Sequence, residues 1–215
     1  MGSEGSEGGQ GMAPTTADRT SARDRLLAAA NELFYEEGVH TVGIDRVIER
    51  AGVAKATLYS TFGSKDELIR SYLDSRYAAR KECISTEVAS HDTPRQRLLS
   101  AFDVLSESIS KPGYHGCAFV NASAEADPSS PILPVVDEYR TWLRTLLADL
   151  ADLADLAGAA GAADPGQLAR QLMMLYDGAG IAARIDGFLT ATAARATAAT
   201  LLDAAVTAKG SLPVS

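Results

Sequence analysis

The sequence is poor in cysteine, histidine and aromatic residues. It has two cysteines and three histidines among 215 residues, and aromatic side chains make up 6%. Two cysteines suggest neither a disulfide framework nor a zinc site. No Ser/His/Asp or paired-carboxylate arrangement stands out, so we expect no enzyme and no metal or other cofactor. Scarce aromatics and abundant alanine favour closely packed helices over sheets.

Long apolar runs are also absent. No stretch approaches the roughly 18 uninterrupted apolar residues of a membrane span, and no signal peptide is recognisable. Residues 1–18 are rich in Gly, Ser and Glu without periodicity, which predicts a disordered tail. We therefore expect a cytoplasmic protein without a membrane partner. Its 46% apolar residues can build one core, or a small head and a larger body.

The chain has no overall positive charge, since its net charge is −8. That charge is unevenly distributed: residues 19–81 carry 11 Lys/Arg against 9 Asp/Glu, and the rest of the chain carries 9 against 19. Nucleic-acid binding requires cations only where phosphates lie, so an acidic total does not exclude it. The acidic body would repel DNA and leave the N-terminal third as the competent face.

The most informative segment is 38–68. A one-sided helix is predicted over 44–51 by apolar residues at positions i, i+3, i+4 and i+7, which are Ile44, Val47, Ile48 and Ala51. Gly52 then supplies the left-handed backbone conformation of a tight turn, which other residues adopt at a cost.

A second short helix, over 54–62, has two contrasting faces. The apolar face carries Ala54, Leu58 and Phe62, and the opposite face presents Lys55, Ala56, Tyr59 and Ser60 to solvent. A helix this short is marginal alone, so its neighbours must hold it while the polar face stays free. This is the geometry of a helix-turn-helix whose second helix enters the major groove of DNA.

These residues carry a family resemblance. The pattern comprises Thr41, Ala51-Gly52-Val53, Thr57-Leu58-Tyr59, Phe62, Ser64-Lys65 and Leu68. It resembles the DNA-binding domain of the TetR/AcrR transcriptional regulators, and the likeness extends upstream through a helix over 21–37 to about Arg19. One departure is Gly43 at the N-cap of helix 44–51, where the family more often has Ser or Thr. Glycine caps helices at a loss of only about a few tenths of a kcal/mol, but a hydroxyl that could touch phosphate is absent.

The resemblance implies an all-α homodimer. A helix-turn-helix domain would span 19–66, and a ligand-binding and dimerisation domain would span 67–215. Two heads would sit in successive major grooves about 34 Å apart on a palindromic double-stranded operator. The implied function is that of a repressor released from its operator by a small organic molecule.

The resemblance also implies specific DNA contacts. Tyr59 and Lys65 match positions that hold backbone phosphates, which place the head without reading sequence. Lys55, Ala56 and Ser60 would face base edges, where lysine can donate to guanine and alanine can touch a thymine methyl group. With Arg46 on the preceding helix, the predicted DNA-binding residues are Arg46, Lys55, Ala56, Thr57, Tyr59, Ser60 and Lys65.

Periodicity and capping signals predict nine helices and no strands. Their ranges are 21–37, 44–51, 54–62, 65–90, 94–110, 117–126, 131–158, 164–186 and 191–209. The fourth is long and would link the head to the body. The segment His115–Asn121 also resembles the C-terminal half of one TetR/AcrR subgroup. The pair His115 and Cys117 is too small a ligand set for a metal site.

A small-molecule pocket among the fifth to eighth helices is a further implication of the resemblance. Its candidate wall residues are Phe102, Tyr114, Phe119, Tyr139, Trp142, Met173 and Tyr176, with Asp177 as a partner for a polar ligand. Aromatic and methionine side chains at helical spacing are more often plain core, so this alternative stays open. Trp142 follows Tyr139 by three residues, and a shared apolar face would suit a drug-sized organic molecule.

The last two predicted helices, 164–186 and 191–209, would form a four-helix dimer interface, as in the family. The small residues Ala179 and Ala183 are the predicted contacts. Two other functions stay open: a helical ligand-binding protein or enzyme with a vestigial head, and an activator or architectural DNA binder without an inducer. Salt-dependent, sequence-specific duplex binding would separate the repressor from the first alternative. Release by a metabolite would separate it from the second.

Overall fold

A computed structural model describes residues 21–156 and 164–210, so the expected tail over 1–18 lies outside the described residues. Within those ranges the fold is all-α, with nine helices and no strand. The helices are α1 (Ala22–Glu37), α2 (Ile44–Ala51), α3 (Lys55–Phe62), α4 (Lys65–Ala89), α5 (Pro94–Ser110), α6 (Ala118–Glu125), α7 (Leu133–Leu156), α8 (Pro165–Asp186) and α9 (Leu189–Gly210). None of them is long and apolar enough to cross a membrane.

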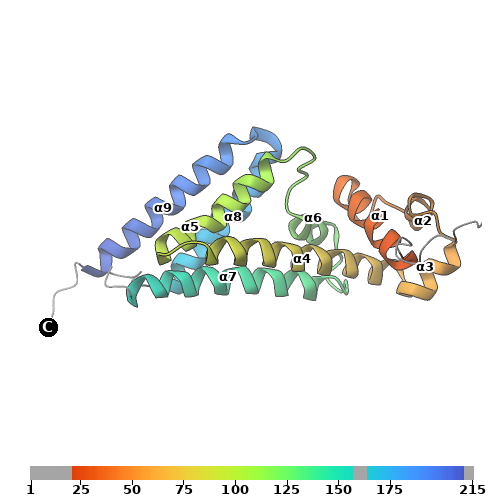
Figure 1. Ribbon diagram of the computed structural model, residues 1–215, viewed down its shortest axis with the longest axis horizontal. Helices are drawn as coiled ribbons and strands as arrows, with labels where there is room; N and C mark the ends of the chain where they lie inside the picture. Colours follow the sequence, from red (N-terminus) through yellow and green to blue (C-terminus); the bar gives the residue numbers. More distant parts are fainter. Residues whose placement is uncertain (1–20, 157–163, 211–215) are drawn as a thin grey trace, which may run out of the picture.

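The helices form a small head and a long body. Figure 1 shows α1, α2 and α3 grouped at one end, with α4 running from this group along the body beside α7. The all-α prediction is confirmed, and the predicted helix bounds agree with the observed ones to within about two residues.

The head is held by a compact apolar core and by specific caps. The Ser21 side chain accepts a hydrogen bond from the Asp24 backbone N–H at 3.1 Å, which satisfies one of the unpaired donors at the start of α1. Gly52 ends α2 in the left-handed conformation, with φ of 62°, as its position in the sequence predicts. From α3, Leu58 and Phe62 are buried against this core. Ala54 is an exception to the predicted apolar face, because it is the exposed N-cap of α3.

Helix α4 belongs to both parts of the molecule. Ser64 caps its start by accepting from the Glu67 N–H at 3.1 Å. Near that end Leu68 is buried with the head, and near the other end Ile84 is fully buried in the body. A single continuous helix therefore packs against both the head and the body.

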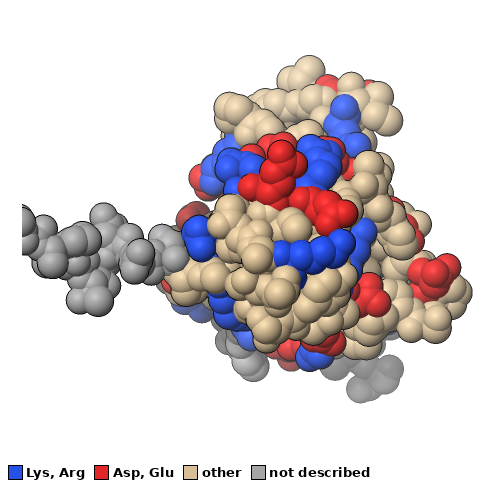
Figure 2. All heavy atoms as spheres, turned by 90° about the vertical axis from the view of Figure 1, so that its right-hand side faces the viewer, with Lys and Arg blue, Asp and Glu red and all other residues tan. Residues whose placement is uncertain are grey.

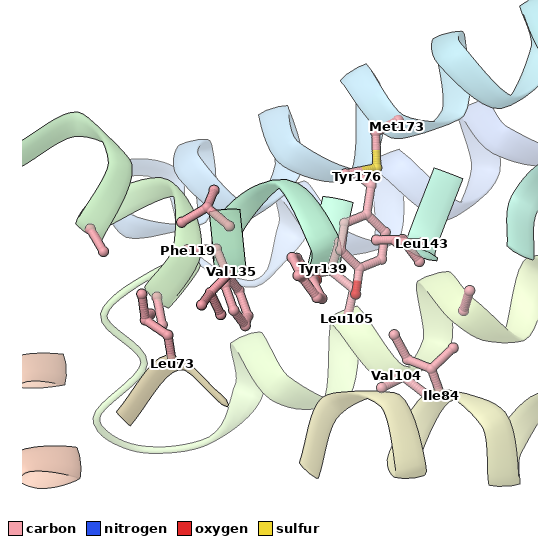
Figure 3. Packing of buried hydrophobic residues seen from close by; sticks show 14 of the residues in the cluster. Leu73, Ile84, Val104, Leu105, Phe119, Val135, Tyr139, Leu143, Met173 and Tyr176 are labelled. Carbon is pink, nitrogen blue, oxygen red and sulfur yellow. The ribbon is translucent and has the colours of Figure 1, made fainter. Parts of the chain in front are cut away.

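The core of the body is aromatic where α5, α6, α7 and α8 meet. Phe119 and Tyr139 stack with ring centroids 3.9 Å apart, and Phe102 meets Tyr176 edge-on at 5.7 Å. Figure 3 shows Phe119, Tyr139 and Tyr176 converging on the same buried cluster. Towards α9 the buried residues become small, including Ala194 and Ala198, which lets α8 and α9 approach closely.

Candidate DNA-binding surface and ligand cavity

The outer face of α3 is exposed and chemically suited to DNA. Lys55, Ala56, Tyr59 and Ser60 are all solvent-exposed. Tyr59 is 46% exposed, an unusual position for a large ring. Leu58 lies on the opposite face with no exposed surface, so packing fixes the helix while its polar side stays available. These four residues lie where the sequence predicts them.

Two of the predicted cations in the head already have carboxylate partners. Lys55 Nζ lies 2.9 Å from Asp45 Oδ1, and Arg46 pairs with Glu37. Each pair is largely solvent-exposed, so each contributes little to stability. In Figure 2, which views the head end of the molecule, lysine and arginine side chains accordingly alternate with acidic ones. Any phosphate that bound these cations would compete with the carboxylates.

Thr57 and Lys65 are less accessible than the other predicted DNA-binding residues. Both are half-buried. The Thr57 carbonyl accepts a hydrogen bond from the Thr61 hydroxyl at 2.6 Å. Lys65 Nζ donates to the His40 carbonyl at 3.5 Å, and burial lowers the pKa of its ammonium. Lys65 therefore lies between the start of α4 and the segment before α2, at the edge of the α3 surface.

A cavity of about 390 Å³ opens between the head and the body. Its wall combines residues of α1, α4, α5, α6 and α7 with the segment that connects α5 to α6. The lining residues are Tyr35, Arg76, Ala79, Arg80, Cys83, Ser108, Lys111, Pro112, Gly113, Tyr114, Gly116, Cys117, Ala118, Phe119 and Tyr139. Its volume lies within the range of about 300–1,000 Å³ that small-molecule sites occupy.

The cavity contains three of the eight predicted pocket residues. Tyr114, Phe119 and Tyr139 line it. Tyr114 also donates a hydrogen bond to the Gly180 carbonyl at 3.1 Å, which joins the cavity wall to α8. Burial raises the pKa of the Tyr139 phenol well above its usual value, so this hydroxyl remains protonated.

The other five predicted pocket residues do not line this cavity. Phe102, Met173 and Tyr176 are packed in the core behind it, as the alternative interpretation expects. Trp142 is half-buried beside Tyr77, with ring centroids 5.9 Å apart. The seventh-helix face that carries Tyr139 and Trp142 is therefore divided between the cavity and the seam with α4.

Asp177 has a partner of its own within the chain. Its carboxylate lies 2.8 Å from the Arg140 guanidinium, so its role is an ion pair between α8 and α7. Burial is the main influence on this carboxyl group and raises its pKa, while Arg140 opposes that shift.

Tyr35, Arg76 and Arg80 are among the cavity residues that the sequence analysis did not predict. Tyr35 lies in α1 and had been counted only as part of the head. Its hydroxyl donates to the Gly116 carbonyl at 3.0 Å and accepts from the His115 N–H at 3.1 Å. No local pattern predicts a contact between residues 81 positions apart. A signal did exist for the arginines, since two cations four residues apart occur in a helix that leaves the head for the body.

Comparisons with known proteins agree with this architecture. Residues 26–72 match the family model of bacterial regulatory proteins of the tetR family, and residues 94–200 match a tetracyclin repressor-like C-terminal domain. The crystal structure of a TetR-family transcriptional regulator from Streptomyces coelicolor is 33% identical and superposes with a TM-score of 0.80, covering 86% of this chain and 96% of that one. The chain belongs to the TetR family.

Curated TetR-family relatives match over shorter segments. The transcriptional activator FasR of Mycolicibacterium smegmatis is 34% identical over 95 residues, which cover 42% of each chain. The transcriptional repressor KstR2 of Rhodococcus jostii is 29% identical over 107 residues, covering 46% of this chain and 52% of the relative. The matches thus span about half the length of these curated relatives, which include an activator and a repressor.

An exposed apolar stripe runs along α8 of this TetR-family chain. Met174, Ile181 and Ile185 are 75%, 50% and 85% exposed, and their spacing places them along one side of the helix. Phe188 and Leu189 extend the stripe beyond its end. Monomeric proteins seldom leave such a surface uncovered.

The structure corrects the choice of Ala179 and Ala183 as dimer contacts. They are 4% and 7% exposed and are buried inside the same chain, on the side of α8 that faces its neighbouring helices. Ala179 and Ala183 lie on the inward face of α8, and the exposed face carries large apolar residues instead. Small residues mark the close helix packing within the chain, and large apolar residues mark the surface left uncovered.

Proposed function

We propose that the protein is a homodimeric regulator of transcription that binds a palindromic operator and releases it when a small organic molecule occupies the cavity. The α3 surface would contact DNA through the seven residues named above. Domain limits of 19–66 for the head and 67–215 for the ligand-binding and dimerisation part fit this division of labour. The exposed stripe of α8 would be covered by the same stripe of a second copy, an arrangement that two-fold symmetry permits.

The observation that carries this proposal is that the cavity wall includes a residue of the head. Tyr35 of α1 lies against Arg76 of α4, 4.0 Å from guanidinium carbon to ring centroid. Arg76 also donates to the Asn31 carbonyl of α1 at 3.2 Å. A ligand that displaced Arg76 or Tyr35 would therefore act directly on the seating of α1 against α4.

A second link joins the head to α6. Glu125 accepts a hydrogen bond from the His40 backbone N–H at 2.8 Å, just before α2. A β-carbon at Gly38 would lie 2.8 Å from the same carboxylate, so the chain requires glycine here, where φ is also 94°. The head is thus held to the body through α4, through α6 and through the segment between α5 and α6. A ligand needs to favour only one of two head orientations to shift operator affinity.

The test begins with the operator. Selection of bound duplexes from a random pool should yield a palindrome whose half-sites are one helical turn apart, about 34 Å. Binding should weaken steeply with salt, because phosphate contacts release counterions. A library of metabolites is then screened for release of that duplex. A protein that binds no duplex selectively contradicts the proposal.

Activation is the second candidate function, because the relative FasR is named an activator. Transcription in vitro from a promoter that carries the selected operator separates the two. Repression lowers transcript yield when protein is added and restores it with ligand, whereas activation raises the yield on protein addition.

A further inference from the structure

The charged residues of the cavity are all of one sign. Arg76, Arg80 and Lys111 line it, and none of the lining residues that the structure describes is Asp or Glu. This composition stands out in a chain whose residues outside 19–81 are strongly acidic. Salt screens the acidic residues on the exposed surface, and Coulomb energy falls with distance, so the cations on the wall have the largest effect on which ligand charge is favoured.

Arg80 is the cation with the strongest need of an anion. It is half-buried, and its guanidinium donates to the Ser108 hydroxyl at 2.6 Å and lies near the Tyr139 hydroxyl. Both partners are neutral, and within the described chain no carboxylate lies within ion-pair distance of Arg80. A guanidinium removed from water without a counter-charge is costly, and an anionic ligand would offset that cost.

The two neighbouring cations, Arg76 and Lys111, already have partners within the chain. Lys111 is exposed and already pairs with Glu107 at 2.9 Å. Arg76 donates to the Asn31 side-chain carbonyl oxygen at 3.2 Å and stacks on Tyr35. These contacts leave Arg80 as the anchor, with Arg76 as a second cation that a bound anion would attract away from α1.

A further unused donor lies beside Arg80. The Tyr176 hydroxyl is buried and has no hydrogen-bond partner within the described residues, and it lies close enough to Arg80 for electrostatic interaction. Buried hydroxyls in proteins are nearly always hydrogen-bonded. Because Tyr176 lies in the core behind the cavity wall, its hydroxyl supplies no counter-charge to Arg80.

The rest of the wall is apolar and partly aromatic. Ala79, Ala118 and Phe119 supply apolar surface, and the ring of Tyr114 supplies a flat one. An apolar body would therefore lie against these side chains while a negatively charged group reached the guanidinium. Arginine binds planar carboxylates through two parallel hydrogen bonds, which would also orient the ligand.

From these contacts we infer that the effector is an organic carboxylate with an apolar or aromatic body, held by Arg80 through its carboxylate group. That this ligand controls DNA binding rests on the proposed function, but binding of the carboxylate to the cavity does not depend on DNA. It also argues against two ligand classes, organic cations and metal ions, because the charged side chains that line the cavity are cationic and Arg80 has no carboxylate partner among the described residues.

The test measures binding of matched probes to the full-length chain by calorimetry. The probes are naphthylacetate, phenylbutyrate and decanoate, each beside its primary amide and the amine of the same length. We expect the carboxylates to bind and the amides and amines to bind at least about tenfold more weakly, since a charge-assisted hydrogen bond is lost. The inference is overturned if the amides or amines bind better, or if the parent protein binds no probe at millimolar concentration.

Variants locate the carboxylate. Arg80→Gln should weaken carboxylate binding about 10- to 100-fold and leave amide binding unchanged, and Arg80→Lys should retain part of the preference. Arg144→Gln is the matched control, because Arg144 is an exposed arginine of α7 that donates to the Thr141 hydroxyl at 3.2 Å and lies outside the cavity. Equal carboxylate binding by the parent and by a folded Arg80→Gln variant contradicts the assignment of Arg80. If Arg80→Gln does not fold, the comparison of acid, amide and amine on the parent still decides.

Operator release distinguishes this inference from the proposed function. If a carboxylate binds through Arg80 without releasing the operator, the carboxylate site is supported and control of operator binding by the ligand is contradicted. If a neutral compound releases the operator and the carboxylates do not bind, ligand control stands and the carboxylate inference fails.

Discussion

Arg76 and Tyr35 join the two parts of the molecule by a stacking contact, with the guanidinium carbon 4.0 Å from the ring centroid. Arg76 belongs to α4 and Tyr35 to α1, so the contact lies at the seam between the head and the body. The same two side chains line the cavity. A ligand can thus change the head without any long chain of intermediate residues.

The first prediction concerns the hydroxyl of Tyr35. Tyr35→Phe keeps the stack on Arg76 but removes the hydrogen bonds with Gly116 and His115. We expect a loss of about 1–3 kcal/mol in unfolding free energy, unchanged operator affinity without ligand, and weaker coupling between ligand and operator. Paired titrations of operator with and without ligand measure this coupling. Tyr77→Phe, whose ring contacts stay intact, is the control, and equal coupling in both variants contradicts the prediction.

The second prediction separates positioning from sequence readout on α3. Tyr59→Ala should reduce affinity for all duplexes alike, because a phosphate contact carries no sequence information. Lys55→Ala should instead change base preference, by about 1–3 kcal/mol at one operator position if Lys55 makes a good base contact. Binding to a set of single-substitution operators measures both effects. Parental behaviour of both variants would mean that α3 does not lie in the groove.

The third prediction compares two neighbouring positions of α8. Ile185→Asp places a charge on a side chain that is 85% exposed, so the chain should fold and remain monomeric with weak operator binding. Ala183→Asp places the charge at a position that is 7% exposed and should destabilise the fold itself. Sedimentation and thermal melts distinguish these outcomes. A dimeric Ile185→Asp protein would show that the stripe is not the interface.

The fourth prediction concerns Trp142. Because it is half-buried at the seam of α4 and α7 and lies outside the cavity, Trp142→Ala should cost less than the about 3–5 kcal/mol of a fully buried tryptophan. Ligand affinity should stay within about twofold of the parent, since no cavity contact is lost. Calorimetric binding beside thermal melts provides the check. Abolished ligand binding in a stable variant would extend the site to Trp142.

The fifth prediction concerns the two thiols. Cys83 is exposed, whereas Cys117 is half-buried, and burial raises the pKa of the Cys117 thiol. Thiolates are the reactive form, so iodoacetamide at about pH 8 should label Cys83 well before Cys117. Peptide mass spectrometry over time reads out both sites. Faster labelling of Cys117, with Cys83→Ser as the reference, would mean that the cavity is more open than described.

Local features of the fold were accessible from the sequence alone. Gly52 and Leu58 illustrate this, because a left-handed turn and a short amphipathic helix are encoded by residues close together. The inward face of α8 was not accessible in the same way. Apolar residues lie on both of its sides, so periodicity shows no preferred face, and adjacent Met173 and Met174 are 5% and 75% exposed.

The cavity needed three-dimensional information for another reason. Tyr35 and Gly116 meet although 81 residues separate them, and such a pair leaves no trace in local patterning. The aromatic residues Tyr139 and Tyr176 illustrate the same limit. Both are buried, yet only Tyr139 reaches the cavity, and sequence spacing alone does not separate these two environments.

The ion pairs of the head affect how strongly its cations can bind DNA phosphates. Arg46 and Lys55 are neutralised within the chain by Glu37 and Asp45 before any phosphate arrives. Each phosphate contact then frees a carboxylate, which gathers a cation from solution while the duplex gives one up. The slope of log affinity against log salt concentration would therefore indicate fewer phosphate contacts than there are cations facing the groove. The acidic residues of the head would also change the residence time on the operator without touching DNA.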